Sequence, residues 1–283
     1  MLLDGAMGTE LIRRGLRLDQ ECAESWNLSR PAEVQSVHAA YAAAGAEVAT
    51  TNTFGATAPR LARFGLLSSQ GEIIRAAVEL AKQGAAGRVI WGSLGPTGET
   101  LPLAGADLAA VEKAFAVAAG HLASAGVSAI HLETMFHPLE LQAAIQGARR
   151  ANLPVYASIA LMPGASGLET PHGVPVARML RALAEGSVDA VGVNCAIEAE
   201  RMLPAVELLR RQFDLPIIAQ PQAKISPKCA TFESNESPAS FARDASALAA
   251  AGAWAVGGCC GTRPEHIAAL HQALHARPQG VHP

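Results

Sequence analysis

Two adjacent cysteines, Cys259 and Cys260, lie between glycines in the segment 257–262 (GGCCGT) of the 283-residue chain. In a regular strand, neighbouring side chains point to opposite faces, so the two thiols would be separated. The flanking glycines can adopt the positive φ values of a sharp turn, which would allow both sulfurs to face one centre. Thr262 and Glu265 have the spacing of a capping box, which predicts that the last helix begins directly behind the pair.

A third cysteine, Cys195, follows another apolar run, and we expect the fold to bring it to the same face as the pair. Three thiolates with an open fourth position are typical of a catalytic Zn²⁺ site. Such a centre has a net charge of about −1, so it polarises a carbonyl poorly. It can instead bind a substrate thiol and favour the ionised, nucleophilic form of that thiol. The three cysteines therefore predict alkyl transfer to a thiol.

The cysteines also allow two other interpretations. A buried cysteine often serves only as a small apolar side chain, and we expect this role for Cys22 and Cys229. The same role for all three clustered cysteines, or a disulfide between the adjacent pair, is the alternative to a metal site. The odd total of five cysteines does not suggest a disulfide framework and indicates a reducing, cytoplasmic compartment.

The elements that must position these residues alternate regularly along the chain. Short apolar runs predict strands at 1–3, 47–51, 89–93, 128–132, 155–161, 190–193, 216–219 and 254–256. Helical patterns between them predict helices at 31–44, 69–83, 108–125, 139–151, 176–184, 199–211, 238–251 and 264–276. Eight βα units of this size predict an α/β fold, a single (β/α)₈ TIM barrel in one domain over residues 1–283. A doubly wound open sheet is the alternative, but the first βα turn lacks the Gly-x-Gly-x-x-Gly pattern.

Several polar residues directly follow predicted strands, which is where the active site of a barrel is built. Asp4, Glu133 and Asn194 all occupy such positions. Asp4 and Glu133 would form a pair of anions that binds the amino group of an amino-acid substrate, and we expect Asn194 to bind substrate beside them. The alternative for both acids is that they cap a helix or stabilise a loop.

The composition excludes several classes of function. Charged residues make up 17% of the chain, the net charge is −3 and no basic run occurs, so we expect no nucleic-acid partner. No apolar stretch approaches the roughly 18 residues of a transmembrane helix, so we expect no membrane association. The first ten residues include Asp4 and Glu10 and lack the basic start of a signal peptide, which again favours the cytoplasm. The polar stretch 220–237 is expected to be a long loop over the barrel mouth, and the sequence leaves open whether it acts as a lid.

Six motifs in order cover almost the whole chain: LLDGAMGTEL, TNTFGA, GSLGPTG, HLETM, VGVNC and GGCCGTRPEHI. Together they resemble the homocysteine S-methyltransferase family. This resemblance implies a (β/α)₈ barrel whose zinc is held by Cys195, Cys259 and Cys260, and whose homocysteine sulfur is methylated to give methionine. Asp4 in the DG motif and Glu133 in the ET motif match the family positions that hold the homocysteine amino group.

The methyl donor differs among members of that family: betaine, S-methylmethionine or S-adenosylmethionine, or methylcobalamin. TNTFGA and GGCCGT look most like the homocysteine-binding module of cobalamin-dependent methionine synthase. Aromatic residues make up only 4% of the chain, which disfavours an aromatic cage for betaine. Gln222 and Lys224 stand where many relatives carry the Asn and Gly of a Pro-Asn-Ala/Ser-Gly turn.

We expect S-methylmethionine or S-adenosylmethionine as the donor, and small molecules as the partners of the protein. One alternative is a homocysteine-activating subunit that accepts the methyl group from a separate methyl-corrinoid or folate protein. The others are a non-catalytic barrel that binds zinc or thiols, and a barrel enzyme of another class whose cysteines are structural.

Overall fold

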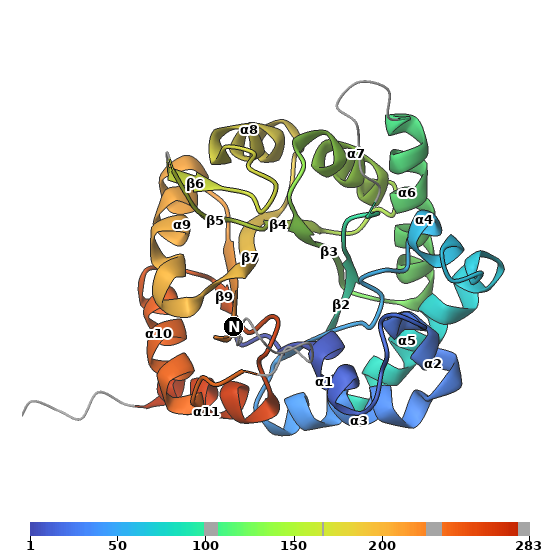
Figure 1. Ribbon diagram of the computed structural model, residues 1–283, viewed down its shortest axis with the longest axis horizontal. Coiled ribbons are helices and arrows are strands. Elements are labelled where there is room, and N and C mark those ends of the chain that lie inside the picture. The colour runs from blue at the N-terminus through green and yellow to red at the C-terminus, as the bar shows by residue number, and fades with distance from the viewer. Residues whose placement is uncertain (99–106, 166, 225–233, 277–283) are drawn as a thin grey trace, which may run out of the picture.

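The computed structural model describes residues 1–98, 107–165, 167–224 and 234–276. Its central strands form a ring that helices surround (Figure 1). Seven of the strands pair in parallel, and their order in the sheet follows the chain. They are β1 (Val48–Thr50), β2 (Val89–Leu94), β3 (Ala129–Met135), β4 (Val155–Ile159), β7 (Ala190–Glu198), β8 (Ile217–Gln222) and β9 (Ala255–Val256).

The first residues of the chain close this ring. Leu2 forms a parallel bridge with Val256 of β9, and Leu3 forms one with Val48 of β1. The Leu3 N–H donates a hydrogen bond to the Val256 carbonyl at 2.8 Å. The strand predicted at 1–3 is therefore reduced to two isolated bridges, because the segment is too short to build a ladder with either neighbour. The predicted (β/α)₈ barrel is confirmed, with this segment in the place of an eighth strand.

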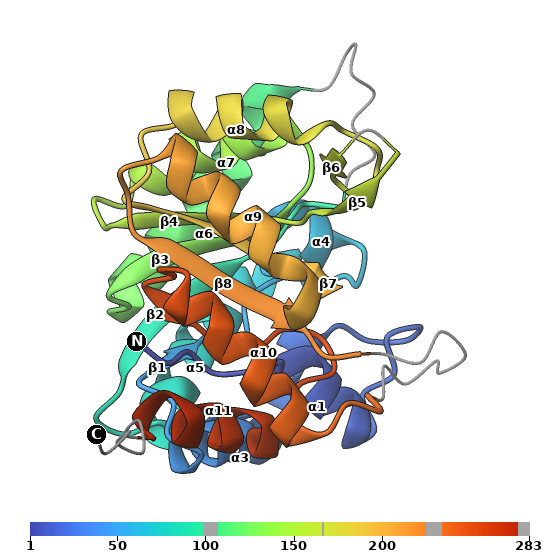
Figure 2. The same cartoon turned by 90° about the vertical axis from the view of Figure 1, so that its left-hand side faces the viewer.

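The helices pack around the outside of the strand ring (Figures 1 and 2). All eight predicted helices are present, and their observed ends agree with the predicted ends to within two residues. They are α3 (Pro31–Ala43), α5 (Gln70–Gly84), α6 (Leu108–Ala125), α7 (Pro138–Arg149), α8 (Val176–Glu185), α9 (Ala199–Gln212), α10 (Pro238–Ala250) and α11 (Pro264–His275). Among the residues that the structure describes, no helix is long and apolar enough to cross a membrane.

The structure also contains short elements that the sequence did not predict. They are the helices α1 (Met7–Arg13), α2 (Trp26–Ser29) and α4 (Ala58–Ala62), the 3₁₀ turns η1 (Ala23–Ser25) and η2 (Leu67–Ser69), and the strands β5 (Met162–Gly164) and β6 (Gly167–Glu169). The last two pair in an antiparallel hairpin that is separate from the barrel sheet. All these elements follow barrel strands or connect them to helices, so they elaborate the βα loops rather than the barrel itself.

An apolar cluster fills the inside of the barrel. It takes one side chain from the closing segment and one from each barrel strand: Leu3, Val48, Trp91, Ala129, Tyr156, Ala190, Ile218 and Ala255. A larger apolar cluster packs the barrel against its helices. Because side chains of a strand face inward at every second residue, the next inward positions of the seven strands are Thr50, Ser93, His131, Ser158, Gly192, Gln220 and Gly257. The barrel interior therefore changes from apolar to polar within two residues, toward the carboxyl ends of the strands.

Candidate active site

The three cysteines predicted to form a cluster lie together at the carboxyl ends of the strands. Cys195 belongs to β7, whereas Cys259 and Cys260 follow β9. Their sulfur atoms all lie within 4.8 Å of one another, and the Sγ atoms of Cys195 and Cys260 are 3.7 Å apart. Each of the three residues is partly buried, and none forms a disulfide. This arrangement could hold one metal ion.

Cys195 reaches the cluster through an unusual backbone. Its φ is 58° and that of Ala196 is 59°, although both are L-residues in the left-handed region. The pairing of β7 with β8 also changes register between Asn194 and Glu198. Such conformations cost of order 1–3 kcal/mol each and concentrate at functional sites. This bend could not be predicted from residue types, since neither residue is a glycine.

The glycines around the adjacent pair act differently from the prediction. Only Gly261 has a positive φ, of 79°. Gly257 and Gly258 are instead required by close packing, because a Cβ at Gly257 would lie 2.6 Å from the Cβ of Leu3. A Cβ at Gly258 would lie 2.7 Å from the Cγ2 of Thr262. These two glycines allow the turn to sit directly against the chain's first residues and the start of α11.

The predicted capping box at Thr262 is wrong. Helix α11 begins at Pro264, its N-cap residue is Arg263, and the Arg263 N–H donates to Nδ1 of His266 at 3.1 Å. The Thr262 hydroxyl donates to the Cys259 carbonyl at 2.7 Å and accepts from the Ala6 N–H at 3.1 Å. Thr262 therefore stabilises the cysteine turn rather than the helix, because its hydroxyl group already bonds to Cys259 and Ala6.

Hydrogen bonds among the three thiols shift their pKa values in opposite directions. Hydrogen bonds from the Cys259 and Cys260 thiols hold the pKa of Cys195 well below its usual value. Hydrogen bonds with Cys195 and Cys260, together with burial, raise the pKa of Cys259. The hydrogen bond between Cys260 and Cys195 is the main cause that raises the pKa of Cys260 to about 12. In the metal-free protein, the cluster therefore favours one thiolate that is hydrogen-bonded by two thiols.

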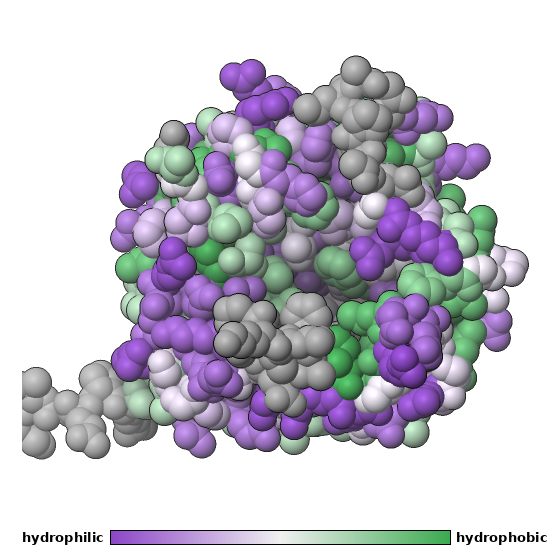
Figure 3. Space-filling model, in the orientation of Figure 1, coloured by the Kyte–Doolittle hydropathy of each residue, from purple (hydrophilic) through white to green (hydrophobic). Residues whose placement is uncertain are grey.

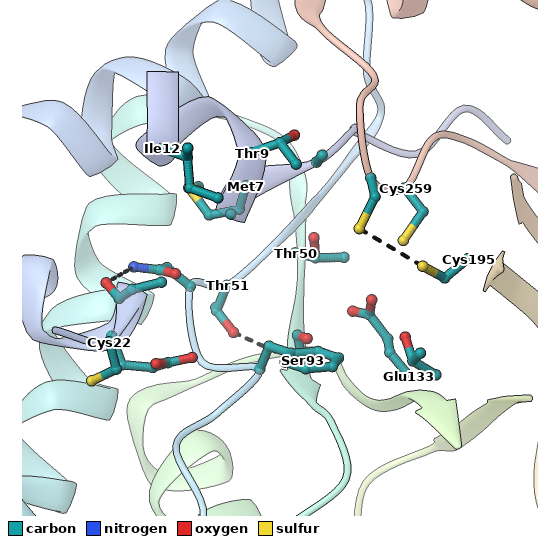
Figure 4. A pocket seen from close by; sticks show the side chains of 18 of the residues that line it. Met7, Thr9, Ile12, Cys22, Thr50, Thr51, Ser93, Glu133, Cys195 and Cys259 are labelled. Atoms are coloured by element: carbon teal, nitrogen blue, oxygen red, sulfur yellow. Dashed lines mark hydrogen bonds between the residues drawn. The ribbon is translucent and has the colours of Figure 1, made fainter. Parts of the chain in front are cut away.

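The cluster opens into a cavity of about 480 Å³. Figure 3 shows that this face of the molecule is hollowed near its centre, with hydrophobic surface along one side of the hollow. In Figure 4, Cys195, Cys259 and Glu133 lie on one side of the cavity, and Cys22 lies on the opposite side. Apolar lining residues include Met7, Ile12, Leu18, Phe54 and Phe64. The volume falls in the range of small-molecule sites.

Glu133 lines this cavity and keeps 13% of its side chain exposed. Burial raises its pKa to about 7, the negative Cys195 acts in the same direction, and a hydrogen bond from Ser93 opposes the shift. On its inner side, Oε1 lies 3.7 Å from Nδ1 of the buried His131. The carboxyl group is therefore held in place at the edge of the cysteine cluster, and a bound cation would favour its ionised form.

Asp4 and Asn194 lie below the cavity rather than on its lining. Asp4 is 2% exposed, and its Oδ2 and Oδ1 accept hydrogen bonds from the Thr50 N–H at 2.7 Å and the Thr50 hydroxyl at 3.0 Å. Burial raises the pKa of Asp4 to about 8, and the negative charge of Glu133 adds to the shift. The Asn194 Oδ1 accepts from the Thr134 N–H at 2.7 Å, and its Nδ2 lies 4.0 Å from the Cys259 sulfur. Both residues thus support the groups that reach the cavity.

Sequence reasoning missed Gln220 and Arg60, which also line the cavity. Gln220 is 3% exposed, and its buried Oε1 has no hydrogen-bond partner among the described residues. Gln220 is two residues after Ile218, and side chains two residues apart in a strand face the same way. This alternation could have placed Gln220 inside the barrel. Arg60 lies on the unpredicted helix α4, and no motif marked it.

Lys224 and Gln222, which depart from the family pattern, bond to nearby side chains. The Lys224 ammonium group donates to Oε2 of Glu200 at 2.7 Å, and Nε2 of Gln222 donates to Oε1 of Glu198 at 3.3 Å. Neither residue is among those that line the cavity. Of the predicted loop 220–237, the first three residues belong to strand β8, and 225–233 lie outside the described residues.

Cys22, expected to be a packing residue, is 7% exposed. It also lines the cavity, away from the cluster. Burial and the nearby Glu24 raise its pKa to about 11, so the thiol stays protonated and unreactive at neutral pH. The other expected packing cysteine, Cys229, lies outside the described residues.

The fold and the site together define a parallel (β/α)₈ barrel with a three-thiol centre at its mouth. A family model described as homocysteine S-methyltransferase matches residues 1–274. The chain belongs to the homocysteine S-methyltransferase family.

Similar proteins include two mycobacterial methionine synthases. The chain is 33% identical to the Mycobacterium tuberculosis protein over 97% of its own length, and 32% identical to that of Mycobacterium leprae over 100%. It spans only 24% and 25% of the lengths of those two relatives. A crystal structure of the homocysteine methyltransferase MmuM from Escherichia coli, in a metallated form, superposes with a TM-score of 0.76 at 27% identity, covering 95% of this chain and 94% of that one.

Proposed function

We propose that this protein transfers a methyl group to the thiol of homocysteine to give methionine, with Zn²⁺ held by Cys195, Cys259 and Cys260. The methyl donor is S-methylmethionine or S-adenosylmethionine. The observation that carries this proposal is a cluster of three thiols that opens into a cavity beside the carboxyl group of Glu133. Family membership and the metallated form of a similar protein support it.

The residues present fit the proposed metal. Zn²⁺ prefers thiolate ligands, and three protein ligands with an open fourth position are typical of its catalytic sites. The three sulfurs come from two segments that the barrel holds rigidly, and they face a cavity large enough for a substrate. When bound, zinc would lower the pKa of an incoming thiol and so favour the nucleophilic thiolate at neutral pH.

The chain's own residues would hold homocysteine by its amino-acid group. Glu133 contacts the ammonium group, and the buried carboxyl group of Asp4 lies behind the wall of the site, where it accepts hydrogen bonds from Thr50. The Oε1 atom of Gln220, which has no partner among the described residues, accepts a further hydrogen bond from the same end of the substrate. Asn194 orients Thr134 and packs near Cys259, so it positions the wall of the site. Burial of these groups excludes water and strengthens each contact.

A second candidate function is supported by the mycobacterial relatives, which are methionine synthases about four times as long as the matched region. In that case the protein would activate homocysteine and accept the methyl group from a separate methyl-corrinoid protein. The cavity is open to the outside of the barrel mouth, as such a transfer would require (Figure 3).

The test is to incubate the zinc-loaded protein with homocysteine and each donor in turn, and to measure methionine. Formation of methionine from a sulfonium donor supports the first proposal. Formation only with a methyl-corrinoid protein supports the second. No methionine with any donor, although the protein binds zinc and homocysteine, would favour a non-catalytic thiol-binding barrel.

A further inference from the structure

The end of the cavity opposite the cysteine cluster contains a second group of charged residues. Cys22 marks this end in Figure 4, and its thiol interacts with the buried Glu24. Glu21, Glu24 and Arg60 all line the cavity. The proposed homocysteine site uses the groups at the cysteine end, so these residues are available to another ligand.

The guanidinium group of Arg60 stacks near an aromatic ring and forms no close ion pair among the described residues. Its guanidinium carbon lies 5.5 Å from the centre of the Phe54 ring, and the residue is partly buried. Among the described residues it makes no hydrogen bond and no ion pair with a carboxylate within 4.0 Å. Guanidinium groups bind carboxylates through two parallel hydrogen bonds, and a partly buried cation gains most from such a partner. A ligand carboxylate is therefore the group that Arg60 is suited to bind.

Glu24 lies beside Arg60 with the opposite charge. It is 4% exposed, and its Oε1 accepts a hydrogen bond from the Gly55 N–H at 2.5 Å. A Cβ placed on Gly55 would lie 2.9 Å from Oε1 of Glu24 and 2.9 Å from Nε of Arg60, so the two side chains flank the same glycine. An anion and a cation held this way complement the ammonium and carboxylate groups of a free α-amino acid.

The surface beside this pair suits the rest of such a ligand. Met7, Ile12 and Phe54 line the cavity with apolar and soft groups. An amino acid with a short apolar stem could therefore be held by its charged end at Arg60 and Glu24, with its side chain directed toward the cysteine cluster. This arrangement would place a second amino acid opposite homocysteine.

We propose that Arg60 and Glu24 bind the carboxylate and ammonium groups of the methyl donor, and that the donor is a sulfonium α-amino acid such as S-methylmethionine. The inference rests on the proposed methyl transfer to homocysteine and specifies its second substrate. The homocysteine sulfur forms a new S–CH₃ bond while the S–CH₃ bond of the sulfonium breaks. The electron pair of the broken bond stays on the leaving thioether, so one S-methylmethionine and one homocysteine give two methionines and the thiol proton.

Calorimetric titration of S-methylmethionine into the zinc-loaded protein tests this inference without turnover. The titration is made alone and in the presence of homoserine, whose hydroxyl replaces the homocysteine thiol. We expect Arg60→Gln to weaken S-methylmethionine binding about 10- to 100-fold, the loss of one charge-assisted contact. Arg63→Gln is the matched control, because it removes the same charge from a neighbour that bonds to the Gly98 carbonyl and does not line the cavity.

The methyl ester of S-methylmethionine supplies a second, independent readout. The wild type should bind the ester as weakly as Arg60→Gln binds the free acid, and the variant should not distinguish the two ligands. Equal binding of acid and ester by the wild type, or equal binding by Arg60→Gln and Arg63→Gln, would overturn the inference. Methionine formation is assayed in parallel, so methyl transfer from a donor without a carboxylate would refute the role of Arg60 while leaving the proposed function intact.

Discussion

Replacing Glu133 by Gln tests the proposed homocysteine site at an acidic group that lines the cavity beside the cysteine cluster. The amide has nearly the same shape as the carboxylate and can still accept a hydrogen bond from Ser93. The substitution removes only the negative charge that faces the cavity. If Glu133 binds the ammonium group of homocysteine, the variant should lose a charge-assisted hydrogen bond and retain the fold.

The size of the effect follows from the burial of this group. Only 13% of the Glu133 side chain is exposed, so solvent screens a bound ammonium group weakly. A hydrogen bond to a charged group contributes about 1.5–3 kcal/mol. At about 1.4 kcal/mol for each factor of ten, homocysteine should bind roughly 10- to 150-fold more weakly.

The assay is calorimetric titration of homocysteine at pH 8, above the pKa of about 7 for this carboxyl group. Metal content, measured on the same samples, should be unchanged. Glu21→Gln is the matched control, since it neutralises a carboxylate that also lines the cavity but accepts a hydrogen bond from the Trp26 indole. A dissociation constant for Glu133→Gln within threefold of the wild type, with the metal retained, would show that Glu133 does not bind the substrate.

Three further predictions concern the metal, the buried acid and the turn. Elemental analysis should find less than one zinc ion per chain in Cys260→Ser. The control Cys22→Ser, whose side chain lies away from the cluster, should keep one zinc ion per chain. Equal zinc content in the two variants would refute the site. Folded Asp4 keeps its proton up to about pH 8, whereas the unfolded chain loses it near pH 3.8. The free energy of unfolding of the metal-free wild type should therefore fall as the pH rises between these values, by up to about 1.4 kcal/mol per pH unit relative to Asp4→Asn. Urea unfolding of both proteins across this pH range measures the difference. Parallel pH curves would contradict this sign. Gly258→Ala should lower the free energy of unfolding by about 1–3 kcal/mol and reduce the affinity for zinc, because the added methyl group would overlap the Thr262 side chain. Unchanged stability and affinity would show that the turn adapts to the methyl group.

The helices and most of the strands could be predicted because their signals are local. Alternation of apolar runs with helical patterns predicted all eight long helices, and a glycine such as Gly126, with φ of 86°, ended α6 at the predicted residue. Strand β7 was predicted to end at Val193 but runs to Glu198. Its last residues bend at Cys195, whose backbone is in the left-handed region. Residue types do not predict this bend, because cysteine rarely adopts that conformation.

The site was predictable as far as residue types allow. The sequence identified the cysteines and the acids, since each follows a strand, but it could not show which of them reach the cavity. Asp4 and Glu133 have equivalent places in the sequence pattern, yet hydrogen bonds from Thr50 hold Asp4 below the cavity while Glu133 lines it. Arg60 depends on a five-residue helix that only tertiary packing stabilises.

The closing bridges at Leu2 and Leu3 have a consequence for how the site is made. The Gly258 N–H donates to the Asp4 carbonyl at 3.0 Å, so the cysteine turn is built on the same seam that joins residues 2–6 to residues 256–262. During synthesis, the cysteine turn can assemble only after residue 262 has left the ribosome and this seam has formed. Formation of the three-cysteine cluster would then report completion of the ring.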